Sequence, residues 1–318
     1  MTIPVLLFAV GLVLLIRGGD WFVDGASSIA RRFHLPEMLI GATVVSIGTT
    51  LPEVMVSVQA ALQHNAGISY GNAIGSIICN TSLIAALTIA VRPGAIQRKT
   101  MALPTAAFFV AALFYATVAR LLGGFSRLHG VILLLGFALY MALTVRAMRA
   151  QLAPVAEAEE ASPLWRDVTL LLLGTVMIAL GANLLVNNGT ILAKAMGVPD
   201  SVIGLTMVAL GTSLPELVTA ITALAKGHSA LSLGNIIGAN LFNLVLVSGA
   251  SIAISPFTLP AERMLLGQSA SLVVDIPLMF AVMAILCLPA LWRGRLARWQ
   301  GVLLLGIYAA FTVYQFVA

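Results

Sequence analysis

Two glutamates, Glu53 and Glu216, stand inside long apolar runs of this 318-residue sequence. A carboxylate at the depth of a lipid bilayer is costly, so an intramembrane glutamate indicates a functional site. Both occupy the same place in a repeated segment, because residues 36–65 and 199–228 align without a gap at a shift of 163. The pair therefore predicts one shared cation site at the interface between two repeats.

Oxygen-bearing groups accompany each glutamate at helical spacing. Ser46, Thr49, Thr50 and Glu53 lie on one face of a helix, because they are separated by steps of about one or two turns. Pro52 has no N–H, and we expect it to break the helix and to free carbonyl oxygens about one turn earlier. Hydroxyls, carbonyls and a carboxylate suit hard cations such as Ca²⁺ and Na⁺, which prefer oxygen ligands. The second copy repeats the pattern with Ala209, Thr212, Ser213 and Glu216.

The next apolar run of each repeat carries a second polar stripe. Asn72, Ser76 and Asn80 follow one another at intervals of four residues, and the matching positions are Asn235, Ala239 and Asn243. We expect Ser76 and Asn80, near the middle of their span, to face the glutamates. The two residues nearer the helix starts, Asn72 and Asn235, suit either helix capping or ligation.

The composition is that of an integral membrane protein. Hydrophobic residues make up 60% of the chain and charged residues 9%, whereas soluble domains contain roughly 25% charged residues. Apolar runs of about 20 residues are long enough to span a bilayer as helices. The net charge of +5 comes from basic residues scattered through short loops, so it does not indicate a nucleic-acid partner. The two cysteines, Cys79 and Cys287, exclude a disulfide framework or a soft-metal cluster.

These runs predict an all-α fold of ten transmembrane helices arranged as two inverted five-helix repeats. The first repeat covers residues 1–148, a linker covers 149–165, and the second repeat covers 166–318. The expected spans lie near residues 4–23, 37–62, 70–90, 102–121, 129–147, 166–187, 200–225, 232–254, 270–291 and 299–317.

The basic residues predict the orientation. If the N-terminus lies outside, the inner loops hold twelve Lys and Arg residues and the outer loops hold four, which agrees with the positive-inside rule. We therefore expect a multi-pass protein of the plasma (inner) membrane, with both termini outside and the 149–165 loop in the cytoplasm. Because each repeat has an odd number of spans, the second enters the membrane in the opposite sense, as in many secondary transporters.

These motifs carry a family resemblance. The segments 48–53 (GTTLPE) and 211–216 (GTSLPE) resemble the α-repeat motif of the sodium/calcium exchanger family. The segments 71–76 (GNAIGS) and 234–239 (GNIIGA) are similar to the second part of that motif. The resemblance covers both halves of the chain, and the calcium/proton exchangers match less well around the glutamate.

The resemblance implies four clustered cation sites around the two glutamates. It implies that Ca²⁺ is bound by Glu53, Glu216 and the carbonyls of Thr49 and Thr212. It implies one Na⁺ site at Glu53, Thr50, Ser76 and the Ser46 carbonyl, and another at Glu216, Ser213, residue 239 and the Ala209 carbonyl. Asn80 and Asn243 would flank the centre.

Two positions depart from the family pattern. Many members have an acidic residue at the position of Asn243, and this acid is tied to K⁺ use, so Asn243 argues against K⁺ dependence. Ala239 replaces a usual serine, and we expect the missing hydroxyl to weaken the outer Na⁺ site.

The function we expect is antiport of Ca²⁺ against Na⁺ by alternating access, within a lipid bilayer and with no resident cofactor. Ca²⁺/H⁺ antiport, in which the glutamates carry protons on the return step, is the alternative in the same class. A cation channel is the alternative from a different class, although channels more commonly line one path with groups from several subunits. An enzyme is not expected, because an intramembrane hydrolase would need a His or paired Asp residues at membrane depth.

Overall fold

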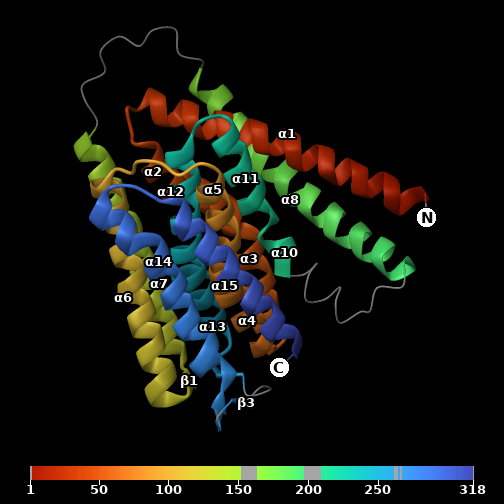
Figure 1. Ribbon diagram of the computed structural model, residues 1–318, viewed down its shortest axis with the longest axis vertical. Coiled ribbons are helices and arrows are strands. Elements are labelled where there is room, and N and C mark those ends of the chain that lie inside the picture. Colours follow the sequence, from red (N-terminus) through yellow and green to blue (C-terminus); the bar gives the residue numbers. More distant parts are fainter. Residues whose placement is uncertain (1, 152–162, 197–208, 261–263, 266, 318) are drawn as a thin grey trace.

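The computed structural model describes residues 2–151, 163–196, 209–260, 264–265 and 267–317, and helices dominate it (Figure 1). In the first half the helices are α1 (Thr2–Arg32), α2 (Glu37–Ile40), the π-helix η1 (Gly41–Val45), α3 (Ser46–Leu62), α4 (Ala66–Cys79), the π-helix η2 (Asn80–Ala85), α5 (Ala86–Val91), α6 (Arg98–Leu122) and α7 (Arg127–Gln151).

The second half begins with α8. Its helices are α8 (Leu164–Ala195), α10 (Ala209–Thr212), α11 (Leu214–Ala225), α12 (Ser229–Phe242), the π-helix η4 (Asn243–Val247), α13 (Ser248–Ile254), the π-helix η5 (Ser271–Asp275), α14 (Ile276–Arg293) and α15 (Arg298–Val317). Short strands join the loops, with β1 (Gly124–Phe125) antiparallel to β2 (Phe257–Thr258), and β3 (Met264–Leu265) antiparallel to β4 (Gln268–Ser269).

The helices confirm the expected all-α membrane fold. Within the described residues, eight helical segments are long and apolar enough to cross a bilayer, and α11 is a shorter apolar helix. The span expected at 200–225 is described only from Ala209 onward. Most of the expected 149–165 linker lies outside the described residues, between the end of α7 at Gln151 and the start of α8 at Leu164.

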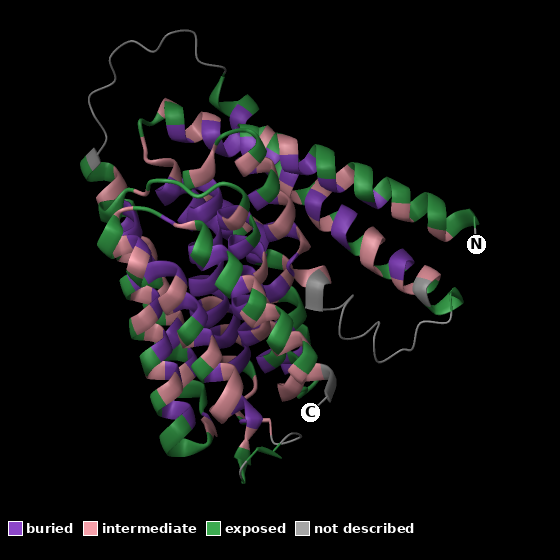
Figure 2. Ribbon diagram, in the orientation of Figure 1, coloured by how far each residue is buried: buried purple, intermediate pink, exposed green. Residues whose placement is uncertain are grey.

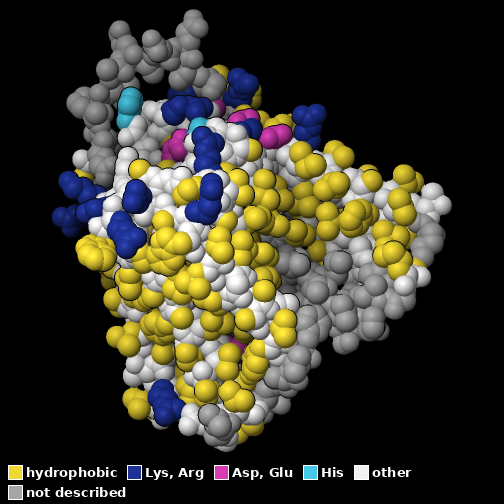
Figure 3. All heavy atoms as spheres, viewed as in Figure 1, with side chains coloured by type: hydrophobic (Ala, Val, Ile, Leu, Met, Phe, Trp, Pro, Cys, Tyr) yellow, Lys and Arg dark blue, Asp and Glu magenta, His cyan; other side chains and the backbone are white. Residues whose placement is uncertain are grey.

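The exposure of side chains also fits a bilayer. Buried residues fill the middle of the bundle (Figure 2), and every residue of α12 from Leu231 to Phe242 is buried. Hydrophobic side chains cover the middle of the face seen in Figure 3, whereas charged side chains gather mainly at one end. We call this end, which includes Arg31, Arg92 and Lys226, the basic end.

Helices α1 and α8 form a closely packed pair. A Cβ atom on Gly18 would lie 2.9 Å from the backbone N of Ile178, and one on Gly25 would lie 2.7 Å from the carbonyl O of Asp167. Small residues at such crossings let helices approach backbone to backbone in membranes. Figure 1 shows the pair side by side, diverging from the rest of the bundle toward the N-terminus of α1.

The helix break expected at the two prolines occurs in only one repeat. Helix α3 runs without interruption through Pro52, and the irregular backbone of that span lies upstream, in η1. In the second repeat the helix is interrupted at Ser213, and Pro215 lies in the first turn of α11. A proline inside a helix removes one hydrogen bond and favours a kink or break, but α3 accommodates Pro52 without interruption, so the prediction of a break at Pro52 was wrong.

Candidate cation-binding site

The two glutamates lie in the interior of the bundle. Glu53 on α3 and Glu216 on α11 each have 0% exposure, and within the described part of the chain none of their four carboxylate oxygens lies within normal hydrogen-bonding geometry of a donor. Helices α3 and α11, which carry the two carboxylates, pack against each other. Two unpaired buried charges of the same sign are strongly unfavourable unless a cation or protons compensate them.

Four neutral side chains share this lack of partners. Thr50 and Ser213, which occupy equivalent positions, are each 1% exposed, and their hydroxyl oxygens have no partner among the described residues. Asn80 and Asn243, also equivalent, are 0% exposed, and no described residue is a partner for either atom of either amide. Buried polar groups in native proteins are normally hydrogen-bonded, and orphaned groups cost about 1–3 kcal/mol each. Three symmetric pairs of orphaned groups therefore indicate a set of ligands built for a bound ion.

The helices cross so that each glutamate meets the other repeat. Helix α3, which carries Glu53, packs against η4, which begins at Asn243. Helix α11, which carries Glu216, packs against η2, which begins at Asn80. π-helical turns inside α-helices are rare and frequently mark functional sites. Both asparagines therefore enter the site where the backbone leaves the regular α-helical pattern.

Asn235 ties the two repeats together below the glutamates. Its Oδ1 accepts hydrogen bonds from Ser46 Oγ at 3.3 Å and from Thr49 Oγ1 at 3.2 Å. Its Nδ2 donates to Thr219 Oγ1 at 3.0 Å, and its main-chain O accepts from Ser46 Oγ at 2.9 Å. The Ser46 and Thr49 hydroxyls are therefore used in bracing the helices, which leaves their carbonyls as the groups to consider for ion binding.

The equivalent Asn72 has a related role. Its Nδ2 donates to the main-chain O of Glu53 at 3.1 Å and to Ser57 Oγ at 2.7 Å. Helix α4 is capped instead by Asn65, whose Oδ1 accepts from the N–H of Ile68 at 3.1 Å. Of the two roles open for Asn72 and Asn235, capping does not occur, and both residues brace neighbouring helices.

The remaining expected ligands are less uniform. Ser76 and Ala239 are buried on α4 and α12, and Thr212 is half-buried at the end of α10. Ala209 begins α10. One polar contact escaped the sequence reasoning: Asn240 Nδ2 donates to Thr81 Oγ1 at 2.7 Å, which joins α12 to η2. The repeat comparison gave no signal for it, because Ile77 occupies the position equivalent to Asn240.

The donor set fits a hard cation. Across the described parts of the chain, no group of three or more His, Cys, Asp or Glu side chains could hold a metal ion by itself. A Ca²⁺ ion takes about 6–8 oxygen ligands, so hydroxyl, amide and carbonyl oxygens would have to supplement the two carboxylates. All these oxygen donors are present around Glu53 and Glu216.

Known proteins match the chain along nearly its whole length. The family model described as sodium/calcium exchanger protein matches residues 3–146 and 167–317. The putative antiporter CaxA of Alkalimonas amylolytica is 35% identical, with 100% of this chain and 99% of the relative covered. The sodium/calcium exchanger MaX1 of Methanosarcina acetivorans is 30% identical, with 99% of each chain covered.

A solved structure matches in three dimensions as well. The sodium-calcium exchanger NCX_Mj, soaked with Na⁺ and Sr²⁺, superposes with a TM-score of 0.82 at 32% identity, covering 98% of this chain and 97% of that one. The two family-model matches correspond to the two halves of the chain, and each half contributes one of the buried glutamates. The chain belongs to the sodium/calcium exchanger family, a family of membrane transporters.

Proposed function

We propose that this protein exchanges Ca²⁺ for Na⁺ across a membrane by alternating access. The observation that carries the proposal is the buried pair of carboxylates, Glu53 and Glu216, surrounded by symmetric oxygen and amide groups without partners. The names of the relatives, MaX1 and NCX_Mj, support Na⁺ and Ca²⁺ as the cargo.

The chemistry of exchange follows from charge. Two carboxylates balance one Ca²⁺, whereas the same carboxylates with neutral oxygens suit several Na⁺ ions. Because both kinds of ion need Glu53 and Glu216, they cannot fill the site together. When either Ca²⁺ or Na⁺ is bound, the cations neutralise the two carboxylates. When no cation is bound, two uncompensated charges remain buried, and they disfavour the closed intermediate through which the protein must pass between its two open states.

We assign the ligands as the motif implies. Ca²⁺ binds Glu53, Glu216 and the carbonyls of Thr49 and Thr212. One Na⁺ site uses Glu53, Thr50, Ser76 and the Ser46 carbonyl. The other uses Glu216, Ser213, residue 239 and the Ala209 carbonyl, and Asn80 and Asn243 flank the centre. No resident cofactor takes part.

Flux measurements test the proposal. Purified protein in proteoliposomes should take up Ca²⁺ when a Na⁺ gradient directed outward drives the exchange. The Glu53→Gln variant serves as the inactive control. A pH gradient without Na⁺, and vesicles with neither gradient, complete the set. Uptake driven by the pH gradient alone would replace Na⁺ with H⁺ as the coupling ion, and uptake with neither gradient would indicate a channel.

We also propose that the basic end faces the cytoplasm, in a plasma or inner membrane. Both termini then lie outside. Single cysteines at two exposed positions, Ser126 directly before α7 and Trp165 in the first turn of α8, report the two faces, because the native Cys79 and Cys287 are buried. An impermeant thiol reagent should label Ser126→Cys in intact cells and should spare Trp165→Cys. The reverse pattern would invert the topology.

A further inference from the structure

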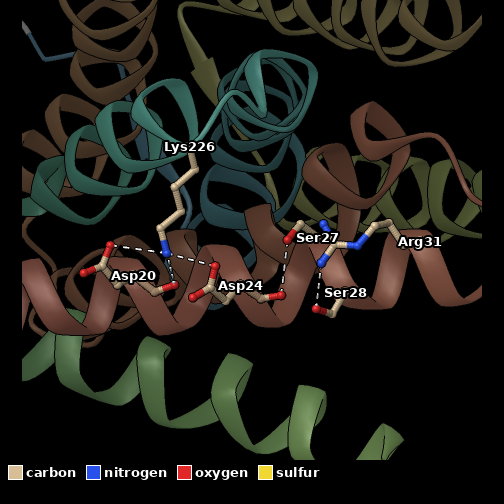
Figure 4. A network of polar contacts seen from close by, with 6 residues as sticks. All are labelled: Asp20, Asp24, Ser27, Ser28, Arg31 and Lys226. Atoms are coloured by element: carbon tan, nitrogen blue, oxygen red, sulfur yellow. Dashed lines mark hydrogen bonds and ion pairs between the residues drawn. The ribbon is translucent and has the colours of Figure 1, made fainter. Parts of the chain in front are cut away.

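A turn in the second repeat contacts three carboxylate side chains of the first repeat. The turn 226–228 joins α11 to α12 at the basic end. Lys226 Nζ lies 2.9 Å from Asp24 Oδ1 and 3.3 Å from Asp20 Oδ1, and it donates to the main-chain O of Asp20 at 3.1 Å (Figure 4). His228 Nδ1 lies 2.7 Å from Glu37 Oε1 at the start of α2.

Lys226 extends an existing contact between α1 and α11. A Cβ atom on Gly19 of α1 would lie 2.7 Å from Val218 Cγ1 and 2.9 Å from Thr222 Oγ1. Val218, Thr222 and Lys226 follow at intervals of four residues, so they share one face of the helix that carries Glu216. The ion pairs therefore attach the basic end of the Glu216 helix to α1.

The opposite end of the molecule has no charge at the equivalent positions. A shift of 163 relates Lys226 to Gln63, Asp20 to Asn183, and Asp24 to Asn187. Asn187 Nδ2 donates to Asn183 Oδ1 at 2.9 Å, a contact within α8 itself. Because the repeats are inverted, these positions belong to the opposite end of the bundle. The two repeats therefore differ: ion pairs connect the helices at the basic end, and uncharged residues occupy the equivalent positions at the opposite end.

We propose that the ion pairs of Lys226 with Asp20 and Asp24 form a latch that holds the basic end closed and biases the protein toward the state open at the opposite end. This inference rests on the proposed function, since alternating access requires contacts at one end to separate when that end opens. The latch side chains are 27%, 39% and 52% exposed, so water screens them. The bias is therefore modest, about two- to five-fold for the two pairs together, because they share the one Lys226 side chain.

The repeat itself supplies the test substitutions. Lys226→Gln, and separately Asp20→Asn with Asp24→Asn, give the basic end the residues of the opposite end. In oriented proteoliposomes either change should lower the half-saturating Ca²⁺ concentration at the basic face about two- to five-fold and raise it at the other face, because apparent affinity follows the population of the competent state. The matched control is Arg31→Gln, which also removes one positive charge, but from a residue that bonds Ser28 Oγ on its own helix at 3.1 Å (Figure 4).

A second measurement does not depend on the cargo. Hydrogen exchange of the purified protein, without Ca²⁺ or Na⁺, should become faster at the last turn of α11 and slower at the turn 63–65 in Lys226→Gln. Faster exchange at the basic end alone would mean local fraying and would overturn the latch, as would equal affinities in Lys226→Gln and Arg31→Gln. If the wild type moves no Ca²⁺ against Na⁺, the proposed function fails, while the exchange measurement still decides the latch.

Discussion

Replacing Asn235 with Ala should destabilise the protein by about 3–5 kcal/mol, because this side chain makes three interhelical hydrogen bonds in the buried centre. Ser46 keeps its bonds to the carbonyls of Gly41 and residue 235, and Thr219 keeps its bond to the carbonyl of Pro215. The Thr49 hydroxyl, by contrast, loses the hydrogen bond that it donates to Asn235 Oδ1. Its penalty of about 1–3 kcal/mol adds to bonds that contribute about 0.6 kcal/mol each in membrane proteins.

The equivalent variant Asn72→Ala is the matched comparison. Asn72 is half-buried and loses two bonds, one to the Glu53 main-chain O and one to Ser57 Oγ. We expect it to cost about 1–2 kcal/mol, because it loses two hydrogen bonds, each of which contributes about 0.6 kcal/mol in membrane proteins. Thermal unfolding of the purified proteins in one detergent measures both variants, and Asn235→Ala should melt at the lower temperature. Equal melting temperatures, or a more stable Asn235→Ala, would refute the assignment of Asn235 as the central brace.

Three further predictions concern the site and the packing around it. Glu53→Gln and Glu216→Gln should each abolish Ca²⁺ flux in proteoliposomes, because each removes a charge from a site that needs both, while circular dichroism should remain that of the wild type. Ala239→Ser should raise the apparent affinity for external Na⁺, because it adds the hydroxyl that the other repeat has at Ser76. Na⁺-dependence curves measured at each face of oriented vesicles test this. If the dependence of transport on external Na⁺ is unchanged, proton coupling is favoured. Gly41→Ala should destabilise the fold by about 1–3 kcal/mol in thermal melts, since its Cβ would collide with the carbonyl O of Leu231, whereas Gly136→Ala, where nothing lies within 4 Å, should not.

The repeats and their polar spacing were sufficient to predict the membrane fold and the two buried glutamates. The pairings Thr50 with Ser213 and Asn80 with Asn243 also follow from one shift of 163 residues, and the structure finds all four buried without partners. These features were accessible because charge and hydroxyl groups at membrane depth are rare and therefore informative.

Backbone detail was not accessible in the same way. The π-helical turns that start at Asn80 and Asn243 insert a residue without any characteristic composition, so no pattern announces them. The two prolines stand in similar sequence contexts, GTTLPE and GTSLPE, yet α3 continues through Pro52 while the second repeat breaks at Ser213. Tertiary packing decides between these outcomes, and the spacing of residues along the sequence does not predict it.

The crosswise packing of α3 on η4 and of α11 on η2 has a consequence for how the protein is assembled. In the proposed site each half of the chain supplies only part of the ligands, so we expect cargo to bind only after the two halves have docked. By mass action, a ligand that binds only the docked form stabilises that form in proportion to the logarithm of its concentration. Bound Ca²⁺ then stabilises the association of the two halves in addition to being transported. Two halves produced as separate chains should therefore associate more tightly when Ca²⁺ is present.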